Sequence, residues 1–187
     1  KRMNNVYLDE IRSWSKHALE KPLDYFNGLP PCPYAEKAWE DNRVDCVVKD
    51  TKYKKPLYQA VFEFPNDVDI VLVIDKKFPK EAKNFHKYLD DMNIAISKGA
   101  FGDRDIWVMG FHPDDSPNEY VDDSAFCNLT EEVYAIIFVQ RLSKLHESAD
   151  KLKKRGYYKI YNNEYDAEEI FKLRETLYRR LKHGNET

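Results

Sequence analysis

The sequence predicts an α+β fold, with a ferredoxin-like split βαβ core at residues 68–161 and helices added at residues 1–42 and 164–183. Three observations carry this prediction. Between residues 68 and 161 the spacing of apolar residues predicts strands and helices in the order β-α-β-β-α-β. This order is typical of an antiparallel sheet with two helices on one face. Both flanking segments carry apolar residues at helical spacing. The length of 187 residues fits a single domain, 1–187, without an internal repeat.

The first segment is expected to be helical in two parts. Apolar side chains recur at helical spacing within residues 4–25, namely Tyr7, Ile11, Trp14 and Ala18. Residues 28–33 (GLPPCP) end that helix, because proline breaks a helix interior. Pro33 is well placed as the first residue of a second helix over 34–41. Cys32 would then lie at a helix N-terminus, where the dipole lowers the pKa of a thiol.

A short edge strand is predicted over residues 43–49 (RVDCVVK) and a short helix over 57–64. The core begins with residues 69–75 (DIVLVID), a continuous apolar run that is typical of a strand buried on both faces. A helix is predicted after Pro79, since apolar residues recur there every three or four positions, namely Ala82, Phe85, Leu89, Met92 and Ile96.

The next predicted strand, residues 106–111, ends at His112 and Pro113. Because proline cannot donate to a ladder, we expect this strand at an edge of the sheet. Residues 133–142 (VYAIIFVQRL) are predicted to return as the adjacent antiparallel strand. Arg141 should therefore lie at the opposite end of the sheet from His112, about 26 Å away.

Three further elements complete the chain: a helix ending at Gly156, a strand over 157–161 and a helix over 167–182. Right-handed crossovers place the strands 68–75 and 106–111 side by side or one strand apart.

The composition excludes several functional classes. The hydrophobic content of 42% supports a real core, and the net charge of −3 with mixed signs argues against a general nucleic-acid or membrane surface. No apolar run approaches the roughly 20 residues that span a bilayer. Cys32, Cys46 and Cys127 are odd in number and lack CxxC spacing, so a reduced, cytoplasmic protein is expected. The common nucleotide, zinc-protease and serine-hydrolase motifs are missing from the sequence.

The first candidate site pairs Cys32 with His112, joined by Asn128. A thiol and an imidazole can form a catalytic pair or bind a metal together. The alternative is that Cys32 packs as a small apolar residue while His112 caps a loop. The loop over 112–130 is long enough to serve as a lid or binding loop. Its acids lack the spacing of a calcium loop, so a solvated acidic loop is the alternative there.

The second candidate site consists of substrate-binding residues, Arg141 and Tyr34. Arg141 ends an otherwise apolar strand, and a charge in that position needs a partner. A guanidinium can bind a substrate carboxylate or phosphate through two hydrogen bonds. The alternative is a structural ion pair with a nearby acid.

Several short segments together resemble an uncharacterised bacterial family. They are residues 28–35 (GLPPCPYA), 69–75, 110–113 (GFHP) and 128–130 (NLT), followed by a strand that ends in Arg141. The resemblance covers about residues 26 to 150 and implies that Cys32, Pro33, His112, Asn128 and Arg141 share one pocket. After Thr130 the chain has Glu-Glu-Val-Tyr in place of the family's Asn-Arg-Ser-Pro type of continuation, which puts a shared anion site in doubt.

Two functional hypotheses stand on these residues. The first is a small cytoplasmic enzyme with a Cys32/His112 pocket; the second is a non-catalytic module that binds a small ligand or a protein partner. The sequence assigns no cofactor or metal, and it leaves a homodimer open. The hypotheses differ in one distance. The enzyme is favoured if Cys32 and His112 face one cavity with Arg141 on its wall, and the module is favoured if Cys32 is buried away from His112.

Overall fold

The computed structural model describes residues 6–115, 131–156 and 167–183. These residues form a mixed α/β fold with a four-stranded sheet and six α-helices. The helices are α1 (Val6–Ala18), α2 (Ala35–Glu40), α3 (Lys55–Phe62), α4 (Ala82–Ser97), α5 (Leu142–Lys154) and α6 (Ala167–His183). The strands are β1 (Val44–Lys49), β2 (Ile70–Asp75), β3 (Trp107–Phe111) and β4 (Ala135–Gln140). Among the described helices, none is both long and apolar enough to cross a membrane.

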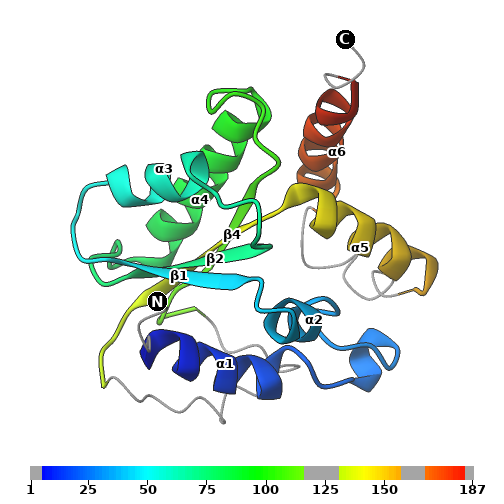
Figure 1. Cartoon of the computed structure of the whole chain (residues 1–187), viewed down its shortest axis with the longest axis horizontal. Coiled ribbons are helices and arrows are strands. Elements are labelled where there is room, and N and C mark those ends of the chain that lie inside the picture. The colour runs from blue at the N-terminus through cyan, green and yellow to red at the C-terminus, as the bar shows by residue number, and fades with distance from the viewer. Residues whose placement is uncertain (1–5, 116–130, 157–166, 184–187) are drawn as a thin grey trace.

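The sheet has the order β1-β2-β4-β3 and is mixed (Figure 1). β4 runs antiparallel to both of its neighbours, so β2 and β3 lie one strand apart, as one of the two predicted arrangements has it. β1 is parallel to β2, with Val44 opposite Ile70 and Lys49 opposite Asp75. The prediction of a wholly antiparallel sheet is therefore wrong at this edge. The physical reason is α3, which carries the chain back so that β2 starts at the same end as β1.

The ferredoxin-like strand order is not established. In that fold the last strand of the core would pair with the first, at the outer side of β2. β1 takes this position instead. The predicted strand over 157–161 lies outside the described residues.

Helices cover both faces of the sheet (Figure 1). We call the face toward α1 and α2 the α1 face, and the face toward α3 and α4 the α4 face. Ile70, Leu72 and Ile74 of β2 pack on the α1 face with residues of α1 and α2. Val71 and Val73 pack on the α4 face with residues of α3, α4 and α6. All six residues of β2 are buried, which confirms the prediction of a strand buried on both faces.

β3 is an edge strand, as the following proline predicts. Its exposed edge is partly covered by Asn93 of α4, whose side-chain amide bonds to both the N–H and the carbonyl of Val108, at 2.9 and 2.8 Å. α4 approaches β3 closely at Gly110, where a Cβ atom would lie only 2.5 Å from Leu89 and 2.7 Å from Phe85. A glycine is therefore required for this packing.

The helices before β1 are shorter than predicted. α1 ends at Ala18, and residues 24–26 form only a single 3-10 turn. α2 begins at Ala35, after a turn in which the N–H of Ala35 bonds to the carbonyl of Cys32 at 3.1 Å. Cys32 thus precedes the helix by a turn instead of beginning it.

Candidate functional site

His112 is a buried residue whose ring nitrogens are both hydrogen-bonded. Its side chain and backbone together are only 4% exposed. Nε2 lies 2.8 Å from the carbonyl of Pro79, which can only accept a hydrogen bond, so Nε2 carries the proton. Nδ1 accepts the N–H of Asp114 at 3.0 Å. The ring also packs against Phe78 and Phe85. This neutral imidazole holds the start of the loop and has no ring nitrogen left for a substrate or a metal.

Cys32 lies beside Tyr34 in a partly buried turn. The N–H of Cys32 bonds to the carbonyl of Leu19 at 3.0 Å, and the Tyr34 hydroxyl donates to the side chain of Gln140. Burial raises the pKa of the Cys32 thiol to about 11, against a smaller lowering by the N–H groups of Tyr34 and Ala35. The prediction of a lowered thiol pKa is therefore wrong, because desolvation outweighs the dipole of the six-residue helix α2.

The sheet separates Cys32 from His112. Tyr34, next to Cys32, reaches Gln140 on the α1 face, at the end of β4 that pairs with Trp107. His112 follows Phe111, at the other end of β3, and contacts side chains on the α4 face. The structure therefore does not bring the two into one site, and Asn128 lies outside the described residues.

Arg141 lies at the opposite end of the sheet from His112, as the strand register predicts. Its Nε donates to the carbonyl of Val68 at 2.9 Å and its Nη2 to the carbonyl of Pro65 at 2.8 Å. Asp69 lies 3.8 Å from Nε and makes its closer ion pair, at 2.8 Å, with Arg43. These contacts fix the orientation of the Arg141 guanidinium beside an open cavity.

The cavity has a volume of about 440 Å³ and opens at the Arg141 end of the sheet. It lies between the end of α3, the segment before β3 and the end of β4. Its walls combine aromatic rings with charged groups, including Phe62, Phe64, Phe101, Arg104, Asp105 and Arg141. This volume falls within the range of small-molecule sites in proteins, about 300–1,000 Å³.

The acidic side chains around the cavity already have partners. Asp105 accepts the N–H of Ser143 at 2.7 Å and its hydroxyl at 2.5 Å, and so holds the start of α5. Asp103 pairs with Arg180 of α6 at 2.6 Å. Neither carboxylate therefore needs a ligand to be satisfied.

Arg104 is different, because its guanidinium makes no hydrogen bond or ion pair within the described part of the chain. It lies over the ring of Phe62, 5.6 Å from the ring centroid. Phe62 is 50% exposed and packs edge-on against Phe101. The site thus offers unused guanidinium N–H groups beside aromatic rings. Sequence reasoning did not find Arg104, and the only signal was a short charged segment, Asp103 to Asp105, before an apolar strand.

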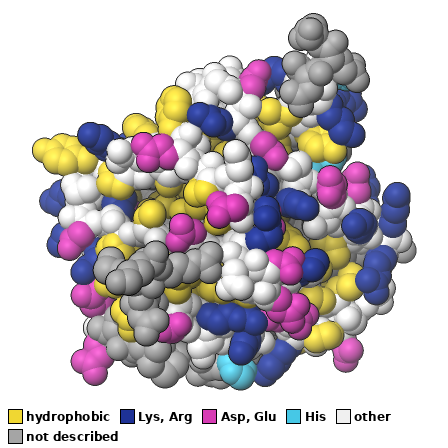
Figure 2. Space-filling model, viewed as in Figure 1, with side chains coloured by type: hydrophobic (Ala, Val, Ile, Leu, Met, Phe, Trp, Pro, Cys, Tyr) yellow, Lys and Arg dark blue, Asp and Glu magenta, His cyan; other side chains and the backbone are white. Residues whose placement is uncertain are grey.

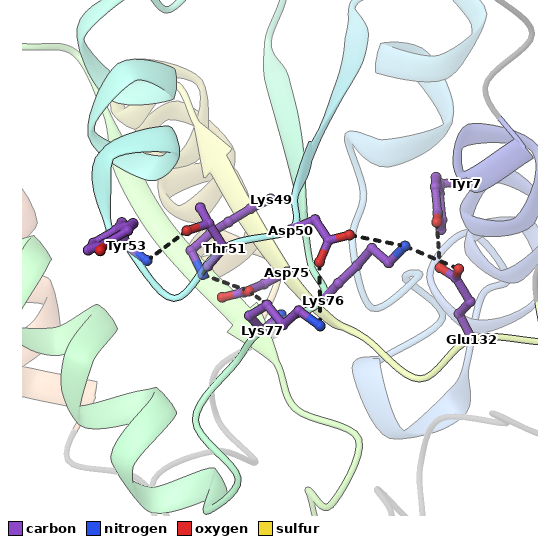
Figure 3. Close-up of polar contacts among 9 residues, drawn as sticks. All are labelled: Tyr7, Lys49, Asp50, Thr51, Tyr53, Asp75, Lys76, Lys77 and Glu132. Atoms are coloured by element: carbon purple, nitrogen blue, oxygen red, sulfur yellow. Dashed lines mark hydrogen bonds and ion pairs between the residues drawn. The ribbon is translucent and has the colours of Figure 1, made fainter.

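The opposite end of the sheet, where β1 and β2 end, holds a buried ion pair. The Lys49 and Asp75 side chains are 4% and 3% exposed. Lys49 Nζ donates to Asp75 Oδ1 and to the carbonyl of Thr51, both at 2.7 Å (Figure 3). The same carboxylate oxygen of Asp75 also accepts the N–H of Lys77 at 3.0 Å. The partners of this buried charge are all supplied by the fold itself.

Exposed and half-buried charges surround that pair. Lys76 contacts Glu132 at 3.1 Å and Asp50 at 3.7 Å, and Tyr7 of α1 donates to Glu132 at 2.5 Å (Figure 3). Among the described residues, no three His, Cys, Asp or Glu side chains are grouped so that they could hold a metal ion.

Comparisons with protein-family models, with curated proteins and with solved structures find no match to this chain. The geometry of the two ends of the sheet is therefore the basis for assigning a function.

Proposed function

We propose that the protein is a non-catalytic ligand-binding module whose cavity holds a small aromatic carboxylate. The observation that carries this proposal is Arg104, the one arginine on the cavity wall with no polar partner in the described residues. A guanidinium can bind both oxygens of a carboxylate through parallel hydrogen bonds. The neighbouring rings of Phe62, Phe64 and Phe101 offer apolar faces and edges for an aromatic ring.

Arg141 has a supporting role in this proposal. Its Nε and Nη2 donate to backbone carbonyls, and its guanidinium carbon lies 5.0 Å from the centroid of the Phe64 ring. This places a second positive charge at the cavity, partly balanced by Asp69. The substrate-binding role expected of Arg141 thus becomes an electrostatic contribution, with Arg104 making the direct contact.

The enzyme hypothesis receives no support from the positions of Cys32 and His112. A nucleophilic cysteine works as a thiolate, whereas burial raises the pKa of Cys32. Tyr34, expected to bind substrate, bonds to Gln140 on the α1 face. The expected reduced, cytoplasmic setting remains part of the proposal and is supported by the free thiol of Cys32. Thiol titration of the denatured, unreduced protein should find three free cysteines.

Isothermal titration calorimetry with matched ligand pairs tests the proposal. One- and two-ring aromatic carboxylates are each compared with their neutral carboxamides. We expect the carboxylates to bind, and Arg104→Gln to weaken them about tenfold or more, because hydrogen bonds to charged groups contribute roughly 1.5–3 kcal/mol. The carboxamides should bind weakly and equally to both proteins.

Arg155→Gln is the matched control, since Arg155 is exposed beyond α5 and away from the cavity lining. It removes the same charge and should leave carboxylate binding unchanged. Equal effects of Arg104→Gln and Arg155→Gln, or no binding of any carboxylate at millimolar concentration, would refute the proposal.

A further inference from the structure

A second surface, at the end of the sheet opposite the cavity, concentrates positive charge. Residues 49–55 and 75–77 contain six lysines and two aspartates, in a chain whose net charge is −3. The two segments are adjacent because β1 and β2 run parallel and end together, with Lys49 opposite Asp75. Four of the six lysines lie within residues 49–55, and folding adds Lys76 and Lys77 beside them. The overall composition does not reveal this concentration of charge. Figure 2 shows Lys and Arg side chains beside exposed hydrophobic ones on the side that carries α3.

Three of these lysines have no acidic partner among the described residues. Lys52 and Lys55 are exposed and take part in no ion pair there. Lys54 lies over the ring of Tyr88, with Nζ 4.2 Å from the ring centroid. The remaining three differ, because Lys49 is paired with Asp75 while Lys76 and Lys77 both lie near Asp50. We call the exposed set Lys52, Tyr53, Lys54 and Lys55 the lysine rim.

Tyr53 stands in the middle of the lysine rim and is 79% exposed. Two hydrogen bonds fix the loop that carries Tyr53. Lys49 Nζ donates to the carbonyl of Thr51 at 2.7 Å, and Thr51 Oγ1 accepts the N–H of Tyr53 at 3.2 Å (Figure 3). The buried ion pair thus anchors a loop that presents an aromatic ring to solvent between lysines. Such a ring is available for stacking at low conformational cost.

The start of α3 adds to the attraction for anions. The helix begins at Lys55 with a proline in its first turn, has no acidic residue there and has no side-chain cap. Pro56 has no N–H, and the N–H groups of Leu57 and Tyr58 already bond to the carbonyl of Lys54. The helix start therefore contributes mainly the positive end of its dipole, which favours a bound negative group. Charge, exposed ring and helix end are three separate features that point to the same chemistry.

We propose that the lysine rim binds single-stranded nucleic acid, with Tyr53 stacking on a base and the lysines and the start of α3 contacting phosphates. Surfaces of this kind combine cations that follow the phosphate backbone with aromatic rings that stack on bases. An acidic peptide would satisfy the lysines but leaves the exposed ring without a role. This inference does not depend on the cavity, which lies at the other end of the sheet.

Fluorescence anisotropy with a labelled 20-nucleotide oligothymidine, measured with the full chain at several salt concentrations, tests the proposal. We expect Tyr53→Ala to weaken binding about tenfold, within the range found for removal of one base-stacking residue. We expect Lys52→Gln with Lys55→Gln to reduce the slope of log K against log salt by about 1.4, since each contact with a single strand contributes roughly 0.7. All three positions are exposed, so these variants should fold.

The charge-matched control is Lys153→Gln with Lys154→Gln, which removes two exposed lysines from α5. It should leave both the affinity and the salt slope unchanged. Absence of binding at 50 mM salt would overturn the proposal, and so would an equal loss of affinity in the control variant. The third contrary outcome has two parts: polyglutamate competes as well as unlabelled oligothymidine does, and Tyr53→Ala has no effect. The last result would identify an acidic protein segment as the partner.

Discussion

One charged pair at one end of the sheet and one arginine at the other end have different surroundings. Where β1 and β2 end, Lys49 and Asp75 bind each other, and His112 nearby uses both ring nitrogens for bonds within the fold. At the other end, Arg104 has only the ring of Phe62 as a partner in the described residues. Removing one partner of a buried charge pair destabilises the fold, because the other charge is left uncompensated. A guanidinium without such partners, beside open aromatic walls, is available to a ligand.

This comparison predicts that substitution of Lys49 or Asp75 changes stability, whereas substitution of Arg104 changes binding at the cavity. The largest effect is expected for Asp75→Asn. It leaves the Lys49 charge buried without a counter-charge, which costs about 3–5 kcal/mol. Urea denaturation should show this loss, and the double variant Lys49→Met with Asp75→Leu should recover much of it.

Asp50→Asn is the control for Asp75→Asn, because the Asp50 side chain is 54% exposed and pairs only at the surface. Its effect should stay within about 1 kcal/mol. Equal losses in Asp50→Asn and Asp75→Asn would show that the buried pair has no special structural role.

His112→Ala is expected to destabilise the fold by about 2–4 kcal/mol, because it removes a buried ring and leaves the carbonyl of Pro79 without its donor. His86→Ala is the matched control, since the His86 ring is 42% exposed and bonds to Asp115. It should cost about 1 kcal/mol or less. Thermal denaturation of both variants measures the difference. A stable His112→Ala protein would contradict the structural role.

The pH dependence of stability tests the charges that orient Arg141. The hydrogen bonds from Arg43 lower the pKa of Asp69. The folded state thus favours the carboxylate, so the stabilisation is present above the unfolded pKa, about 3.9, and is lost as the pH falls through the folded value. Asp69→Asn should cost about 1 kcal/mol at pH 7. The difference from the parent protein should shrink below about pH 4 in acid-titrated urea curves.

The last prediction concerns the chemical reactivity of the Cys32 thiol and not the stability of the fold. With its pKa raised to about 11 the thiol stays protonated at neutral pH. In a Cys46→Ser, Cys127→Ser background, native protein at pH 8 should react with iodoacetamide at least about tenfold more slowly than unfolded protein. The rate should rise as the pH approaches that pKa. If Cys32 reacted at pH 7 as fast in the native protein as in the unfolded chain, that result would support the hypothesis of a catalytic thiolate.

The sequence predicts those parts of the fold that depend on local pattern. The continuous apolar run at β2 shows its burial on both faces, and Pro113 shows that β3 is an edge strand. The register of β3 and β4 then places Arg141 at the opposite end of the sheet from His112. The direction of β1 is not predictable in this way, because the pattern of a strand is the same whether its neighbour runs parallel or antiparallel.

The candidate site depends on contacts that local pattern does not contain. The expected thiolate at Cys32 relied on the dipole of one short helix, whereas its pKa is set by burial among residues from other segments. Arg104 is an ordinary arginine in the sequence. Its significance arises because α3 brings Phe62 beneath it while the neighbouring acids are satisfied by Ser143 and Arg180.

The most direct test of the central claim is an NMR titration of ¹⁵N-labelled protein with the best-binding aromatic carboxylate. We expect the side-chain Nε–H resonance of Arg104 and the backbone amides of residues 101–106 to shift together and to saturate. Resonances of Lys49 and Asp75 should stay in place. Shifts confined to the Lys49 end, or an Arg104 resonance that does not move at saturation, would contradict the assignment of the cavity as the ligand site.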